Sequence, residues 1–374
     1  MSVPVFWAAL ALVLYAYLLY PLLVRWLARH FGSVPQCAEY APPLTVVIAA
    51  CNEATRIEAR VRDVLAQDYP PGNLRVIVVD DGSADGTAVA AAAANDSRVR
   101  VLRLDCNRGK ANALNAAIAE IADGLVAFTD ARQRFAPNAL RKLAEPFADP
   151  RVGAVSGELM IAASDGSGDI GLYWRMEVAL REGEARLHWL HGVSGAIHAM
   201  RRERIPALPS GLILDDMYLP LAARFAGDWV WMARDAIALD TASASGAEEF
   251  RRKLRTLAGN WQLMARMPRL LNPLGNPVFF AWVSHKLLRL LAPWALIVAL
   301  AASALLAARP FYFVLLLLQL AAYVGAALAI LFPRQTARIP LLATAGTFAM
   351  LNLAALLSLP ACLALDPRGL WKKH

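Results

Sequence analysis

The sequence has 374 residues, of which 58% are hydrophobic, and this content is too high for a simple soluble globular protein, so part of the chain is expected in lipid. The formal net charge of +8 suits an anionic membrane surface or a phosphorylated substrate, and equally an ordinary solvated basic face. The four cysteines form no CxxC pair, which argues against a disulfide framework or a cysteine zinc site and favours a reducing compartment.

An apolar run lies at the beginning of the chain. Residues 5–24 carry no charge and are long enough to span a bilayer. Arg25 and Arg29 follow the run, whereas a cleaved signal peptide carries its charge before the apolar stretch. We therefore expect residues 1–41 to form a retained transmembrane anchor and a linker, with both arginines in the cytoplasm.

Residues 42–276 contain short β-branched runs that alternate with helix-like stretches. The runs cover 44–48, 74–79, 99–104 and 125–129, and the stretches cover 55–67, 87–94, 111–121 and 138–147. Apolar strands separated by helices of this length predict an α/β fold with a mostly parallel, Rossmann-like sheet and flanking helices. Ligands of such sheets lie beyond the carboxyl ends of the strands, so the site is expected directly after these runs.

Polar clusters follow the first two predicted strands. Carboxylates at a strand end can accept hydrogen bonds from a base N–H and from ribose hydroxyls, while turn formation and helix capping are the alternative. We favour turn formation and helix capping for Ser83 and Asp85 only. The residues expected to bind a nucleotide here are Ala50, Asn52, Glu53, Asp80 and Asp81.

Two further polar positions follow later strands. Lys110 stands where a helix is expected to begin, and a cation there could meet a diphosphate. Asp130 ends the fourth predicted strand, and its carboxylate can hold a ribose or a divalent metal ion. The GxGxxG and GxxxxGK[ST] spacings do not occur, so other nucleotide-binding folds are weak alternatives.

Taken in order, Asn52-Glu53, Asp80-Asp81-Gly82-Ser83, Gly109-Lys110 and Asp130 resemble the motifs of the family 2 glycosyltransferases, over residues 42–267. The anchors resemble those of its membrane-bound members, which are related to cellulose and hyaluronan synthases. The resemblance implies a GT-A fold, a cytoplasmic catalytic domain over 42–276 and a nucleotide-sugar donor, with a UDP-sugar expected. It also implies that the first two clusters hold the nucleoside, and that Asp130 holds ribose, diphosphate and Mg²⁺ or Mn²⁺.

One residue departs from the Asp-x-Asp motif of that family. Arg132 replaces the second Asp, which is usually the direct metal ligand. Either Asp130 binds the ion with help from the donor phosphates, or Arg132 supplies fixed positive charge beside the diphosphate. We favour a retained metal, because one guanidinium offsets only part of the charge on a leaving diphosphate.

The Leu214-Asp215-Asp216 segment resembles the family's Thr-Glu-Asp motif, whose last carboxylate is the general base of inverting enzymes. The resemblance implies that Asp216 is the base. For Asp215, which is expected at the acceptor site, helix capping or support is favoured over direct catalysis. An earlier loop of small residues resembles the loop that lies under the acceptor in this family. Small residues at such a position let the backbone approach a sugar. Its acceptor-binding positions are Gly192, Ser194 and Gly195. The neighbouring His188 and His191 suggest a metal site that no Asp or Glu pattern supports.

A basic helix-like stretch precedes the C-terminal apolar region and resembles the family's Gln-x-x-Arg-Trp motif. Arg252 replaces Gln, Arg255 is retained and Thr256 replaces Trp. The two arginines share a helix face and could both face the diphosphate, while attraction to anionic lipid is the alternative. Trp261 could replace the missing Trp at the acceptor site.

Residues 277–374 are expected to form an interface helix and about three transmembrane segments. The stretch 276–291 reads as amphipathic, which favours a place for His285 at the membrane surface rather than in catalysis. The apolar runs that could span are 287–308, 311–332 and 341–365. Four crossings would leave Lys372 and Lys373 outside, against the positive-inside rule. Asn352 and Pro360 interrupt the last apolar run, so a re-entrant last segment is an alternative that the sequence does not decide.

These expectations describe an inverting hexosyl- or aminohexosyltransferase, multi-pass in a bacterial inner membrane, that transfers sugar to a lipid-linked or glycan acceptor. No nucleic-acid partner is expected. Single addition is favoured over processive synthesis, because a processive enzyme needs a channel of several helices and the Trp of Gln-x-x-Arg-Trp. A non-catalytic partner that binds nucleotide or glycan is the alternative from another class, and Arg132 is its best support.

Overall fold

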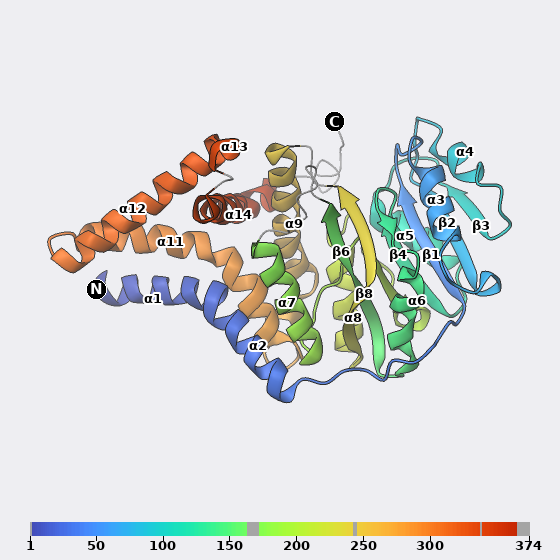
Figure 1. Ribbon diagram of the computed structural model, residues 1–374, viewed down its shortest axis with the longest axis horizontal. Helices are drawn as coiled ribbons and strands as arrows, with labels where there is room; N and C mark the ends of the chain where they lie inside the picture. Colours follow the sequence, from blue (N-terminus) through green and yellow to red (C-terminus); the bar gives the residue numbers. More distant parts are fainter. Residues whose placement is uncertain (1, 163–171, 242–244, 337–338, 365–374) are drawn as a thin grey trace.

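The computed structural model describes residues 2–162, 172–241, 245–336 and 339–364, and Lys372 and Lys373 lie outside them. In Figure 1 a sheet with its covering helices lies on the right, long apolar helices lie on the left, and α7 and α9 lie between the two. The helix α7 spans Leu172–Arg186 and α9 spans Gly246–Arg266. The predicted α/β fold with added apolar helices is confirmed.

The described residues form one eight-stranded sheet in the order β3-β2-β1-β4-β7-β6-β8-β5. The first four strands are parallel where they pair, β7 runs antiparallel to β4 and β6, and β6 is parallel to β8. The strands are β1 (Leu44–Ala50), β2 (Leu74–Asp80), β3 (Val99–Arg103), β4 (Leu125–Asp130), β5 (Arg134–Phe135), β6 (Val152–Ala162), β7 (His198–Arg201) and β8 (Trp229–Thr241).

Helices cover both faces of the parallel part of the sheet. Successive side chains of β1 point to opposite faces, so Val46 and Ile48 pack with α3, α4 and α6, while Val47 packs with α5 and α8. Burial on both faces explains why these strands are almost continuously apolar. The helices are α3 (Ile57–Leu65), α4 (Thr87–Ala92), α5 (Lys110–Ala119), α6 (Ala139–Ala144) and α8 (Asp215–Phe225).

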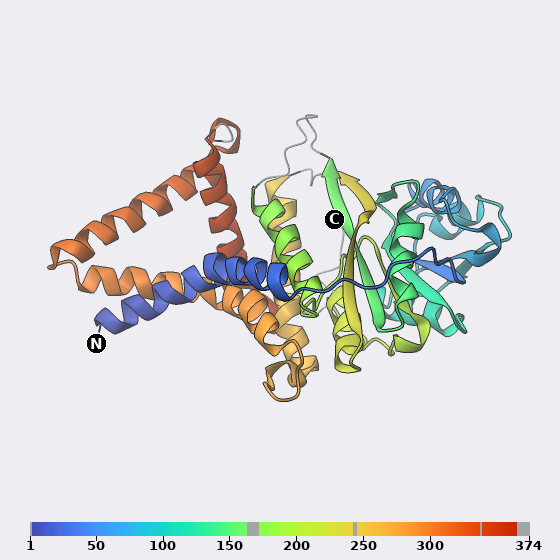
Figure 2. The same ribbon diagram turned by 60° about the horizontal axis from the view of Figure 1, so that its bottom comes forward.

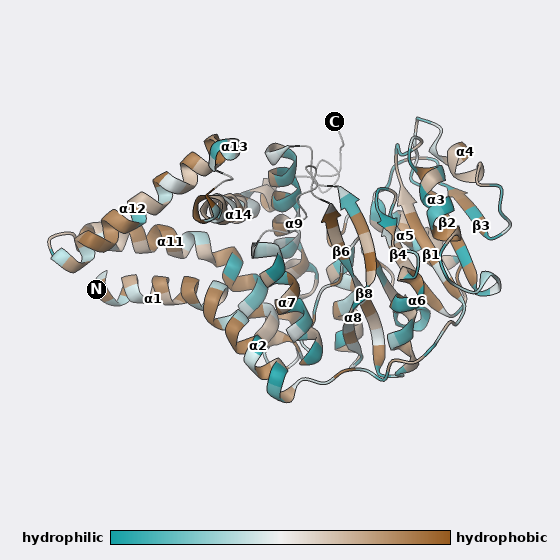
Figure 3. Cartoon of the chain, viewed as in Figure 1, coloured by the Kyte–Doolittle hydropathy of each residue, from teal (hydrophilic) through white to brown (hydrophobic). Residues whose placement is uncertain are grey.

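Four helices of the described residues are long and apolar enough to cross a membrane: Ser2–Phe31, Phe279–Leu305, Pro310–Leu331 and Pro340–Ala364. The first is formed by α1 (Ser2–Leu14), a π-helical turn and α2 (Tyr20–Phe31), and the second by α10 (Phe279–Trp282), a π-helical turn and α11 (Leu288–Leu305). The last two are α12 and α14, with the short α13 (Pro333–Thr336) between them. Figure 2 shows these helices projecting together from the sheet domain, and in Figure 3 most of their length is coloured as hydrophobic.

Two details differ from the sequence expectation for this region. The amphipathic stretch and the following apolar run form one continuous helix, Phe279–Leu305, and His285 within it is buried rather than at a surface. The helix α14 runs unbroken through Asn352 and Pro360, where the sequence left an interruption open, and Asn352 Nδ2 donates a hydrogen bond to the Phe348 carbonyl one turn earlier. Of the packing contacts, α14 against α9 and α2 against α7 join the apolar helices to the sheet domain.

Candidate active site

The carboxyl ends of β1 and β2 bring the first two polar clusters together. Asp81 N donates to the Ala50 carbonyl at 2.9 Å, and Asn52 N donates to Ser83 Oγ at 2.9 Å. Asn52 Oδ1 accepts from Ala84 N at 3.1 Å, and its backbone has φ +55°. Glu53 is buried beside the start of α4, where its N–H donates to Thr87 Oγ1. The clusters therefore form one interlocked edge, as the positions of the strands predict.

The two carboxylates at the end of β2 organise the backbone around them. Asp80 Oδ1 accepts from Ser83 N at 2.9 Å. Asp81 accepts from Arg108 N at 2.9 Å and from Gly109 N at 2.8 Å, so it fixes the loop that leads into α5. Gly109 has φ +87°, a conformation that favours glycine. Both carboxylates are buried, and these hydrogen bonds are contacts that the sequence did not predict.

Lys110 lies among carboxylates from two elements, β4 and α8. Its Nζ lies 3.2 Å from Asp130 Oδ1 at the end of β4 and 3.1 Å from Asp215 Oδ2 at the start of α8. Burial disfavours the ammonium, but Asp130, Asp215 and Asp216 outweigh it and raise the pKa of Lys110. Lys110 is therefore a charged centre that positions Asp130 and Asp215 relative to each other. The sequence placed it near a diphosphate and missed this pairing.

Asp216 follows Asp215 in the first turn of α8 and lies beside the predicted acceptor loop. Burial is the largest cause that raises the pKa of its carboxyl, to about 6, and Asp215 adds to the shift while Lys110 opposes it. Val193 N donates to the Asp216 carbonyl at 2.9 Å. A Cβ at Gly195 would lie 3.2 Å from Asp216 Oδ2, so glycine leaves room beside this carboxylate.

The other small residues of the loop 191–196 are held against the same region. Ser194 N donates to Ser156 Oγ of β6 at 2.9 Å, and Ser156 Oγ also accepts from Arg181 Nη2 at 3.1 Å. Gly192 faces Met217 of α8. Burial lowers the pKa of Arg181, whereas acidic neighbours including Asp216 counteract the shift. Arg181 is thus a cation close to the site that no motif in the sequence signals.

The arginines of α9 lie in different surroundings. Burial lowers the pKa of Arg255, and Asp130, Asp216 and Asp215 oppose that shift, so its guanidinium lies within electrostatic reach of these three carboxylates. Arg252 pairs with Glu249 of its own helix at 2.7 Å. Trp261, expected at the acceptor site, donates from Nε1 to Ser358 Oγ of α14 at 2.9 Å and so joins α9 to that helix.

Arg132 is directed to β8. Its Nη2 lies 2.7 Å from Asp240 Oδ2, which also accepts from Gln133 Nε2 at 3.0 Å. Asp240 is almost fully buried and offsets the charge of Arg132, a pairing that the sequence did not predict. The side chain of Asp130 is 44% exposed, so it presents carboxylate oxygen to solvent. This site fits a divalent ion that takes one protein carboxylate and its remaining ligands from phosphate and water.

Comparisons with known proteins identify the family and the fold of the chain. A model of the family described as Glycosyl transferase family 2 matches residues 45–205. Among solved structures, the mannosyltransferase PcManGT from Pyrobaculum calidifontis, in complex with GDP-Man and Mn²⁺, has a TM-score of 0.73 and 27% sequence identity. That similarity covers 96% of this chain and 99% of the mannosyltransferase.

Two curated relatives are similar over shorter segments. The succinoglycan biosynthesis protein ExoO of Rhizobium meliloti (strain 1021) is 38% identical over 111 residues, which is 30% of this chain and 31% of that protein. An N-acetylglucosaminyltransferase of Bradyrhizobium elkanii is 34% identical over 133 residues, which is 34% of this chain and 72% of that protein. For ExoO and for a Sinorhizobium fredii N-acetylglucosaminyltransferase, the match spans about a third of the relative's length.

Proposed function

The chain belongs to glycosyl transferase family 2, and from this premise we propose that it is an inverting glycosyltransferase that transfers a sugar from a nucleotide-sugar to an acceptor at a membrane. The observation that carries the proposal is the group of acidic side chains around Lys110. It places Asp216, with a raised pKa, next to a loop of small residues and beside the metal candidate Asp130.

The proposed reaction is a direct displacement at the anomeric carbon. Asp216 accepts the proton of the acceptor hydroxyl, the acceptor oxygen bonds to the anomeric carbon, and the nucleoside diphosphate leaves from the opposite face, which inverts the configuration. Lys110 holds Asp130 and Asp215 in place through its two ion pairs. Mg²⁺ or Mn²⁺ at Asp130 would neutralise charge on the diphosphate. Arg255 adds positive charge within electrostatic reach of Asp130.

The donor is proposed to be a UDP-linked hexose or aminohexose, bound with its nucleoside at the edge formed by Asn52, Glu53, Asp80 and Asp81. The N-acetylglucosaminyltransferase relatives support an aminohexose. The test is nucleotide release by the full chain in nanodiscs, with UDP-GlcNAc, UDP-Glc, UDP-Gal and GDP-Man supplied in turn together with a lipid extract. Release with a UDP-sugar is expected. No release with any donor would instead favour a non-catalytic nucleotide-binding protein.

The acceptor is proposed to reach the site from the membrane. The helix α9 carries Arg255 near the acidic group and packs along α14, to which Trp261 is hydrogen-bonded. The apolar helix α14 therefore lies next to a helix of the proposed active site, which suits a lipid-linked acceptor or a growing glycan. Single addition remains our proposal over processive synthesis, because the four candidate membrane helices of the described residues are few for a polymer channel.

The pH profile of kcat/KM is expected to rise through pH 6 and to level off above it. The base must be ionised, and the pKa of Asp216 is raised to about 6, so activity is lost as pH falls through that value. The measurement is the initial rate at low donor concentration between pH 4.5 and 8.5, with circular dichroism over the same range as the control for unfolding. A midpoint near 4, the ordinary value for Asp, would contradict the perturbed base.

Residues 42–276 are proposed to face the cytoplasm of a bacterial inner membrane, where nucleotide-sugars are made. Ser97 is exposed in the turn between α4 and β3, so a cysteine there reports on this side. In a variant whose native cysteines are replaced by serine, Ser97→Cys should react with an impermeant maleimide only after spheroplasts are lysed. Labelling of intact spheroplasts would place the domain outside and overturn the topology. Lysed spheroplasts are the positive control.

A further inference from the structure

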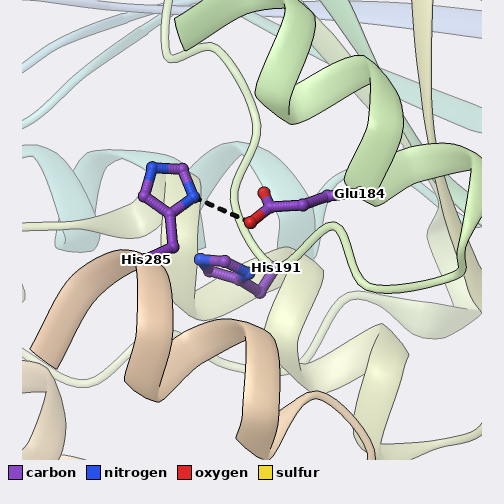
Figure 4. Close-up of side chains that lie close together, drawn as sticks. All are labelled: Glu184, His191 and His285. Carbon is purple, nitrogen blue, oxygen red and sulfur yellow. Dashed lines mark hydrogen bonds and ion pairs between the residues drawn. The ribbon is translucent and has the colours of Figure 1, made fainter. Parts of the chain in front are cut away.

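Three buried side chains from separate elements converge at the start of the acceptor loop. They are Glu184 of α7, His191 at the start of the loop and His285 of the apolar helix Phe279–Leu305 (Figure 4). One ligand atom of each lies within 4.8 Å of the other two. All three residues are at most 1% exposed. None of them has a part in the proposed sugar transfer.

The hydrogen bonds of the two imidazoles direct their lone pairs into this space. His191 Nδ1 lies 3.0 Å from the Trp189 carbonyl, which can only accept, so Nδ1 carries the proton and Nε2 keeps its lone pair. His285 Nε2 lies 2.5 Å from Glu177 Oε1, and a proton on Nε2 leaves a lone pair on Nδ1 of the neutral ring. Carbonyl and carboxylate acceptors behind a histidine are the usual second shell of a metal site.

Glu184 provides the observation that favours a metal ion. His285 Nδ1 is 2.9 Å from Glu184 Oε1, so either a proton or a metal ion must lie between these two atoms. Tyr20 Oη also donates to Oε1, at 2.8 Å. The second oxygen, Oε2, is buried and has no hydrogen-bond partner among the described residues. A proton on His285 would satisfy Oε1 and leave Oε2 unpaired.

We propose that Glu184, His191 and His285 bind a zinc ion. The two imidazole nitrogens and both oxygens of Glu184 supply four ligand atoms, and this donor set is one that zinc takes in proteins. The ion gives Oε2 its partner and separates Glu184 Oε1 from the lone pair of His285. Glu177 does not bind the ion but accepts from His285 Nε2, and it also pairs with Arg289 at 2.7 Å.

The zinc ion would hold three parts of the protein together. Glu184 belongs to the helix that packs against the N-terminal anchor, His285 belongs to a candidate membrane helix, and His191 begins the loop that runs beside Asp216. The site is therefore structural, since it fixes the acceptor loop against the membrane helices and supplies no reacting group. Removing the ion is expected to lower the melting temperature, because an ion bound only by the folded state stabilises that state.

The test is the metal content of the full chain, purified in detergent through an affinity tag without histidine from cells grown with added zinc. Elemental analysis should find about one zinc ion per chain in the wild type and in the matched control His30→Ala, whose ring is exposed on α2. The variants His191→Gln and Glu184→Gln should lose most of the zinc. Wild-type protein stripped by a chelator should melt at a lower temperature, and zinc alone should restore it.

Two results would overturn the site. The first is a wild-type metal content below about a tenth of a transition-metal ion per chain, together with a melting temperature that added zinc does not change. This result would leave His285 as an imidazolium between Glu177 and Glu184. The other is unchanged zinc content in His191→Gln. Because the wild type and His191→Gln decide the matter, a failure of Glu184→Gln to fold leaves the test intact.

Discussion

The substitution Asp216→Asn is expected to lower turnover by roughly 10²-fold or more, the scale of general-base catalysis, while donor binding stays nearly unchanged. Asparagine keeps the size of the side chain and a hydrogen-bond acceptor but cannot take a proton at this position. The backbone contact from Val193 to the carbonyl of residue 216 does not depend on the side chain. The measurement is kcat for nucleotide release together with the Kd of the donor by calorimetry.

Two other carboxylates serve as comparisons for this variant. Asp215→Asn should have the smaller effect, since Asp215 pairs with Lys110 and acts as a positioning residue in this account. Asp96→Asn is the remote control, because Asp96 pairs with Arg98 in a turn next to β3. Near-normal turnover in Asp216→Asn would remove this residue from the role of base. A larger loss in Asp215→Asn would move the role to its neighbour.

Rigorous chelation is expected to abolish turnover, and Mn²⁺ or Mg²⁺ should restore it. Asp130 presents oxygen to solvent, whereas the guanidinium of Arg132 is turned to Asp240 and its charge is already offset there. A leaving diphosphate therefore needs charge from an ion. The measurement is turnover after chelation and after each ion is added back separately.

The competing hypothesis gives Arg132 the place of the metal. Turnover would then survive chelation and would fall in an Arg132 variant by about 2–4 kcal/mol of transition-state stabilisation, the worth of a lost electrostatic donor. Arg132→Gln is the sharper variant, because glutamine still donates a hydrogen bond to the buried Asp240 while the charge is removed. Full activity after chelation would overturn metal dependence. Recovery with Mn²⁺ in the absence of zinc separates this site from the one at His191.

The sequence predicted the parallel half of the sheet well, and the reason is physical. Strands such as β1 are buried on both faces, so they appear as continuous apolar runs that end in polar residues. The long strands β6 and β8, which pair with each other, were not predicted. The polar residues after β1, β2 and β4 were found because the carboxyl ends of parallel strands share one edge.

The contacts that depend on tertiary packing could not be predicted. Lys110 at the start of α5 meets Asp215 at the start of α8, about a hundred residues later in the chain, and nothing local to either residue signals this pair. His285 was placed at a membrane surface because its surroundings in sequence are amphipathic. In the structure Glu177 and Glu184 of α7 enclose it, so a polar residue in an apolar helix is buried with partners from a distant segment.

The anomeric configuration of the product tests the central claim most directly. The full chain in nanodiscs would be given its accepted donor, labelled with ¹³C at the anomeric carbon, together with the acceptor, and the new linkage would be determined by NMR. We predict that the linkage has the configuration opposite to that of the donor, and that Asp216→Asn forms almost none of it. Retention of configuration, or transfer at the normal rate without the Asp216 carboxylate, would contradict the account.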